Sequence, residues 1–162
     1  MIIQQNRPYV KDAPPPKKII KNVTLPSFEV SYSKIPLSLS KEDVAHDITK
    51  LFQKNAVLVP QTANPKGNIG FVISYASSRL TDEVKSVKLN QHKKKYPRIV
   101  LLFVTTEGCD QAREYSRDLS FISVPDVEMG IVVFNPDDGH LDSKCDVNLK
   151  TLQSVEEFTK RK

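Results

Sequence analysis

The densest group of side chains able to bind a metal lies in an acidic turn near the C-terminal end of the chain. It consists of Asp137, Asp138, His140, Asp142, Cys145 and Asp146. A calcium-binding EF-hand loop needs oxygen ligands at positions 1, 3 and 5 and a glutamate at position 12. Counted from Asp137, position 3 is Gly139 and position 12 is Asn148. Because aspartate and glycine favour turns for local reasons, the segment predicts a polar turn leading into a helix, with no metal site.

Two cysteines, Cys109 and Cys145, are the candidates for nucleophilic chemistry. Pairing Cys109 with His92 or His140 brings together suitable residue types, but no surrounding motif supports such a pair, and the G-x-S-x-G turn is missing. Two cysteines are too few for a disulfide framework and lack the CxxC spacing of zinc sites. The N-terminal residues carry no secretion signal, which favours the cytosol or nucleus. We therefore expect both cysteines to be reduced thiols.

The sequence contains no glycine-rich loop for binding phosphates. Its nearest match, Lys-Gly-Asn-Ile-Gly at residues 66–70, lacks the lysine and serine of a P-loop and precedes an expected strand instead of following one. No complete set of catalytic residues can be assembled from the chain. We therefore expect a protein that is not an enzyme, needs no cofactor and has no small-molecule substrate.

A second group of residues is basic. On a helix, Lys85, Lys88, His92 and Lys95 would form one stripe, because they follow one another at intervals of three, four and three residues. With their flanking residues, the candidate DNA-binding residues are Lys85, Lys88, His92, Lys93, Lys94, Lys95 and Arg98. Such a stripe can neutralise several phosphates and release their counterions.

A second interpretation of the stripe is a lysine-rich helix face that only contacts solvent. The formal net charge of +5 does not decide between the two, because many proteins carry such an excess. Aromatic residues that could stack on the bases of single strands are limited to Tyr96 in this region. Nucleic-acid binding is therefore one of two open alternatives.

Strands and helices alternate along the chain that holds these groups. Apolar runs predict strands at residues 28–32, 69–75, 99–104 and 129–134, and 56–59 is a shorter apolar run. Ser40 is an expected N-cap, and helical periodicity follows it. Further helices are expected at residues 81–96, where Leu80, Val84, Val87 and Gln91 would share one face, at 110–119 and near the C-terminal end. This order predicts an α/β three-layer sandwich with a mainly parallel central sheet flanked by helices.

With 162 residues, the chain can form one domain of ordinary size. Residues 1–26 combine five prolines with Lys17, Lys18 and Lys21, and this composition predicts a flexible Pro/Lys-rich N-terminal arm. Residues 27–162 are expected to form the single α/β domain. No stretch approaches the roughly 20 apolar residues of a membrane helix, so no membrane association is expected.

Three segments resemble the central domain of the XPF-type nuclease family. They are IGFVISY at 69–75, RIVLLFV at 98–104 and MGIVVFNP at 129–136, with the helices between them. The resemblance is to non-catalytic partner subunits of that family. Active members carry Glu-Arg-Lys at the end of the second strand and a later Asp, because two carboxylates must hold a divalent metal. These positions fall on Ile73, Ser74, Tyr75 and Arg79, so the resemblance implies an inactive, XPF nuclease-like fold.

The resemblance implies that the chain forms a heterodimer with a larger XPF-like protein and helps to bind branched or single-stranded DNA in the nucleus, in recombination or repair. Excision-repair partners continue into a helix-hairpin-helix module, whereas this sequence ends at Lys162. That difference favours likeness to the small subunit of the meiotic Zip-Spo crossover complex. The rival interpretation is an α/β protein–protein interaction subunit with no DNA role.

The closing helix carries a candidate partner interface. Its apolar ridge consists of Leu149, Leu152, Val155 and Phe158. A subunit that forms a heterodimer needs such a surface. The alternative is that the ridge packs on the sheet of its own domain, as one face of an amphipathic helix normally does.

Overall fold

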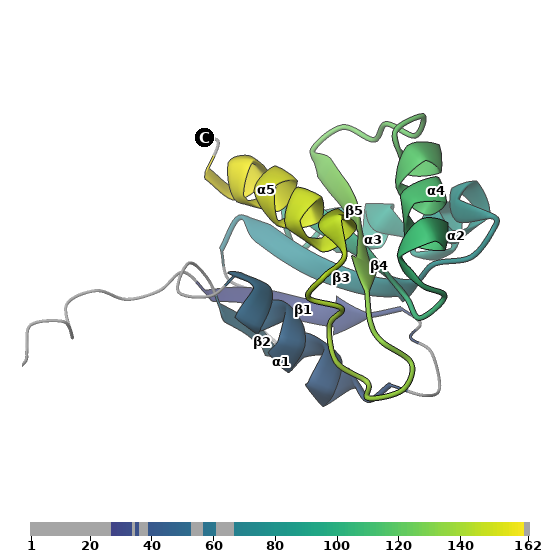
Figure 1. Ribbon diagram of the computed structural model, residues 1–162. Coiled ribbons are helices and arrows are strands. Elements are labelled where there is room, and N and C mark those ends of the chain that lie inside the picture. The colour runs from purple at the N-terminus through teal and green to yellow at the C-terminus, as the bar shows by residue number, and fades with distance from the viewer. Residues whose placement is uncertain (1–26, 34, 36–38, 53–56, 61–66, 161–162) are drawn as a thin grey trace, which may run out of the picture.

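The computed structural model describes residues 27–33, 35, 39–52, 57–60 and 67–160 (Figure 1). The predicted arm, residues 1–26, lies outside this part of the chain. The elements are β1 (Ser27–Tyr32), α1 (Lys41–Phe52), β2 (Val57–Pro60), β3 (Ile69–Tyr75), α2 (Leu80–Ser86), α3 (Leu89–Lys93), β4 (Arg98–Thr105), α4 (Cys109–Leu119), β5 (Val127–Val133) and α5 (Asp146–Lys160).

The five strands form one sheet in the order β2-β1-β3-β4-β5, and every neighbouring pair is parallel. Strand β4 lies between β3 and β5, and its residues from Ile99 to Thr105 are buried. A strand covered on both faces needs apolar side chains on both, which explains the continuous apolar run of this segment. The predicted α/β sandwich with a parallel sheet is confirmed.

Helices cover both faces of the sheet, giving three layers (Figure 1). One core joins the sheet to α1 and α5 through side chains such as Ile48, Phe71 and Phe158. The other joins it to α2, α3 and α4 through side chains such as Leu80 and Tyr115. None of the helices in the described ranges is long and apolar enough to cross a bilayer.

Helix α1 begins as its sequence predicts. The Ser40 hydroxyl accepts a hydrogen bond from the Asp43 N–H at 3.1 Å, which satisfies one of the free N–H groups of the first turn. Glu42 and Asp43 add negative charge where the helix dipole favours it. Val44 and Ile48 point into the core and are fully buried.

The single helix predicted for residues 81–96 is wrong. The structure has two short helices, α2 and α3, and Lys88 between them adopts a left-handed conformation with φ of 59°. In one continuous helix, Val87 and Leu89 would point in opposite directions. The turn at Lys88 buries both of them and leaves Gln91, which the prediction placed on the apolar face, exposed.

The outer edge of β5 is closed by two side chains of α5. The Asn148 side chain accepts a hydrogen bond from the Val133 N–H at 2.8 Å and donates one to the Val133 carbonyl at 3.1 Å. The Thr151 hydroxyl donates to the Ile131 carbonyl at 2.6 Å. Unpaired edge groups invite pairing with other strands, so these bonds protect part of the edge.

Candidate functional site

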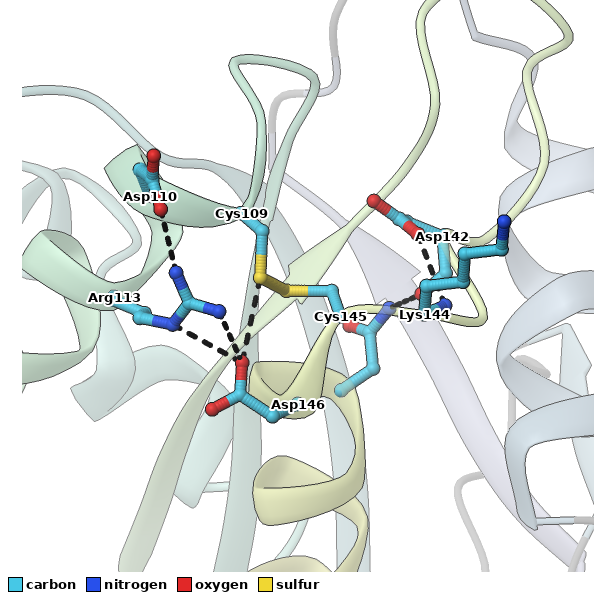
Figure 2. A network of polar contacts seen from close by, with 8 residues as sticks. Cys109, Asp110, Arg113, Asp142, Lys144, Cys145 and Asp146 are labelled. Carbon is cyan, nitrogen blue, oxygen red and sulfur yellow. Dashed lines mark hydrogen bonds and ion pairs between the residues drawn. A yellow bond between two sulfur atoms is a disulfide. The ribbon is translucent and has the colours of Figure 1, made fainter.

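The expectation of two reduced thiols is wrong, because Cys109 and Cys145 form a disulfide with an Sγ–Sγ distance of 2.06 Å (Figure 2). Helix α4 starts beyond the carboxyl end of β4, and the loop after β5 returns to start α5 beside it. Two cysteines 36 residues apart in the sequence therefore meet. Their number gave no hint of this pairing, which depends on which strands are neighbours.

An ionic network lies beside the disulfide (Figure 2). The Arg113 guanidinium contacts Asp146 Oδ1 through Nε at 3.2 Å and through a terminal nitrogen at 3.0 Å, and it contacts Asp110 Oδ1 at 2.6 Å. The hydrogen bonds from Arg113 lower the pKa of Asp146, and Asp146 in turn raises the pKa of Arg113. Both groups therefore stay charged at neutral pH.

A cavity of about 460 Å³ opens next to Cys145, between α1, α5 and the loop 135–145. Its polar lining includes Asp47, Lys50, His140 and Asn148. In parallel α/β sheets, ligands bind most often beyond the carboxyl ends of the strands, and the loop that follows β5 lies there. The cavity is therefore in a position suited to a small ligand.

A buried carboxylate anchors this loop. The Asp47 side chain is 4% exposed, and its Oδ2 accepts hydrogen bonds from His140 Nδ1 and from the Leu141 N–H, both at 3.0 Å. Asp47 Oδ1 is buried without a hydrogen-bond partner among the described residues. The bond to Oδ2 orients the His140 ring, which is 63% exposed. The other ring nitrogen, Nε2, is left to hydrogen-bond with a ligand.

A carboxylate–histidine pair can move a proton, but nucleophilic catalysis also needs a nucleophile hydrogen-bonded to the histidine. In the described part of the chain, no serine, threonine or cysteine forms such a bond with His140. The pair therefore fixes the loop and offers a hydrogen-bonding group to the cavity. Sequence patterns could not reveal it, because Asp47 and His140 are separated by 93 residues.

The predicted polar turn after β5 matches the structure. Asp138 Oδ1 accepts a hydrogen bond from the His140 N–H at 2.9 Å, and Asp142 Oδ1 accepts one from the Lys144 N–H at 3.1 Å. One cluster of three metal-capable groups occurs within the described ranges, formed by Cys109, Cys145 and Asp146. It is unsuited to a metal while the disulfide is intact, because the thiolates that would bind the ion do not exist.

The structure divides the predicted DNA-binding residues into two groups. Lys85, Lys88, Lys94 and Lys95 are exposed, and we call these four the lysine surface. They lie on and beside α2 and α3, and the break at Lys88 means that they do not form one helical stripe. None of the four forms an ion pair with a described residue.

The other three predicted DNA-binding residues are partly buried. The Lys93 ammonium donates a hydrogen bond to the Pro125 carbonyl. Burial, and then the nearby Lys95, lower the pKa of His92, so this ring is neutral at neutral pH. The Arg98 guanidinium lies 4.2 Å from the centre of the Phe158 ring and donates to the Phe158 carbonyl, which holds the end of α5. Lys93 and Arg98 therefore stabilise the fold, and His92 carries no charge.

Tyr96, the aromatic residue considered for base stacking, is buried. Its hydroxyl donates to the carboxylate of Glu29 on β1, and only 3% of the residue is exposed. Its ring also lies against Gly70, where any side chain would collide with it. Tyr96 therefore has a structural role and cannot stack on a nucleic-acid base.

The predicted partner ridge is also divided. Val155 and Phe158 are buried in the domain's own core, and Leu152 packs against that core. The alternative stated for the ridge, packing on its own sheet, therefore holds for these three side chains. Leu149 is 57% exposed and stays a candidate for a partner contact.

The positions that the proposed XPF resemblance would align with the active-site residues of that family carry no carboxylate. Ile73 and Ser74 are fully buried at the end of β3, and Tyr75 is half-buried. Arg79 is exposed and lies 3.8 Å from Asp82. No family model, no curated protein and no solved structure matches the chain.

Proposed function

We propose that this protein is a non-catalytic α/β subunit that binds nucleic acid through the lysine surface. The observation that carries the proposal is the exposure of Lys85, Lys88, Lys94 and Lys95 within one short stretch of chain. Nearby acidic groups are engaged elsewhere, since Asp82 pairs with Arg79 and the Glu83 carboxylate accepts from the Ser86 hydroxyl at 3.4 Å. Four ammonium groups that form no ion pair with a described residue are suited to contact phosphates.

The XPF resemblance makes the proposal more specific. The resemblance places the two metal-binding carboxylates on Ile73, which is buried, and on Arg79, which is exposed and cationic. Neither side chain can hold a metal ion, which supports a subunit that binds DNA without cleaving it. The substrates would be branched or single-stranded DNA, and the partner a larger XPF-like protein. Leu149, exposed on α5, is the residue of the predicted partner ridge that remains for such a contact.

A role in DNA recombination or repair would place the protein in the nucleus. Disulfides persist mainly in oxidising compartments, so the Cys109–Cys145 pair does not add support for that location. In a nucleus, where thiols are kept reduced, this pair would have to be a reversible one. The nuclear location therefore rests on the proposed DNA role.

The direct test is binding of the purified protein to branched, single-stranded and duplex DNA at several salt concentrations. We expect binding at low salt that weakens steeply as salt rises, because each phosphate contact releases a counterion. Fluorescence anisotropy with labelled DNA gives the dissociation constants. If no DNA is bound even at 50 mM salt, by the protein alone or with its partner, the nucleic-acid proposal is wrong.

A second candidate function is protein binding with no DNA role. It is favoured by two large apolar side chains that stand in solvent, Phe121 at 83% and Leu149 at 57% exposure. Such residues at a surface often mark contacts with partners. The DNA-binding experiment separates the two candidates, because an interaction subunit would show neither binding at low salt nor a dependence on the lysine surface.

A further inference from the structure

The two cysteines of the disulfide differ in their exposure to solvent. Cys145 lies just before α5 and is 2% exposed, whereas Cys109, the first residue of α4, is partly exposed. Thiol–disulfide exchange begins when a thiolate reaches one sulfur of the bridge, so access decides which sulfur is attacked. In this protein, Cys109 is the more exposed of the two cysteines.

Charges next to this sulfur are fixed by the ionic network. Asp146 Oδ1 lies 3.5 Å from Cys109 Sγ (Figure 2). This contact is not a hydrogen bond in the oxidised protein, because a disulfide sulfur carries no hydrogen. A bare carboxylate there would repel an incoming thiolate, but Arg113 pairs with the same oxygen at 3.0 Å and offsets its charge.

We propose that the Cys109–Cys145 disulfide is an exchange site for low-molecular-weight thiols, attacked at Cys109. A thiolate forms a new bond to Cys109 Sγ while the bond between the two protein sulfurs breaks. The electron pair leaves on Cys145, whose thiolate takes a proton from solvent. A second small thiol, the reductant, then attacks the mixed disulfide, releases the small-molecule disulfide and leaves Cys109 as a thiol.

Exchange would change the cavity wall. Cys145 lines the cavity at the end of the loop 135–145. The same loop is held by Asp47, which accepts from the Leu141 N–H, and by Asn148, which donates to the Asp142 carbonyl at 3.0 Å. Once the bridge opens, these side-chain contacts remain and the covalent link to α4 is lost. The redox state of the protein would then set how firmly this wall is held.

The test treats the oxidised, folded protein with reduced glutathione, stops the reaction with acid and maps the products by mass spectrometry. We expect glutathione on Cys109 and none on Cys145. Asp146→Asn should speed the reaction and Arg113→Gln should slow it, each about four-fold. This is the effect expected when one unit charge about 5 Å from the attacking thiolate is removed in water. Arg117→Gln changes an exposed arginine in the last turn of the same helix and should leave the rate unchanged.

Three results would overturn the proposal. One is glutathione attached to Cys145 instead of Cys109. Another is a folded protein that glutathione does not reduce unless denaturant is added, because the bridge would then be purely structural. The third is equal rates for the wild-type, Asp146→Asn and Arg113→Gln proteins. The experiment involves none of the lysines, so its outcome is independent of the DNA-binding proposal.

Discussion

Replacing both Cys109 and Cys145 with alanine is expected to lower the free energy of unfolding by about 4 kcal/mol. The bridge joins residues 36 apart, and cross-linking a loop of that length removes much of the entropy of the unfolded chain. For a domain of this size, the melting temperature should fall by roughly 10 °C. Urea denaturation followed by circular dichroism, fitted with a separate slope for each protein, measures the change.

The matched control is the wild-type protein with and without dithiothreitol. The reductant should lower the stability of the wild-type protein to that of the double-alanine protein and leave the latter unchanged. If the wild-type midpoint does not respond to dithiothreitol under conditions where free-thiol titration shows full reduction, the bridge contributes no stability and the prediction is contradicted.

The second large effect is expected for Asn148→Ala, which should cost about 3 kcal/mol. The substitution removes the hydrogen-bond partner of the Val133 N–H and one of the two partners of each of the Val133 and Asp142 carbonyls. Asn148 is 3% exposed and the Val133 backbone lies at the buried sheet edge, so water cannot easily replace the lost bonds. Thermal and urea denaturation of the variant give the loss directly.

Gln153→Ala is the control for Asn148→Ala, because Gln153 is exposed on the same helix. It should change stability by less than about 0.5 kcal/mol. A similar loss in the two variants would mean that the helix as a whole is sensitive to substitution. The account would also be contradicted if Asn148→Ala were as stable as the wild-type protein.

Much of the fold could be predicted from local patterns. The continuous apolar run from Ile99 to Val104 belongs to a strand buried on both faces. Ser40 caps helix α1, as its sequence predicts. The break at Lys88 was missed, because period counting favoured Gln91 as an apolar-face position when Leu89 was the better choice. A polar residue on an expected apolar face was the available signal.

The candidate sites were harder to predict, because they depend on contacts between distant parts of the chain. Cys109 meets Cys145, and Asp47 meets His140, only once the strand order is known. Residue type alone also overestimated how many of the basic residues are available to bind DNA. Arg98 covers Phe158, a contact that no spacing rule could anticipate.

The most direct test of the central claim compares two variants that lose the same number of positive charges. One replaces the lysine surface, Lys85, Lys88, Lys94 and Lys95, with glutamine; the other replaces four exposed lysines elsewhere, Lys50, Lys144, Lys150 and Lys160. Binding to labelled branched DNA is measured between 50 and 200 mM salt. The first variant should lose about three units of the salt slope and about 100-fold in affinity at low salt, while the second keeps most of both. Equal losses in the two variants, or no loss in the first, would contradict the account.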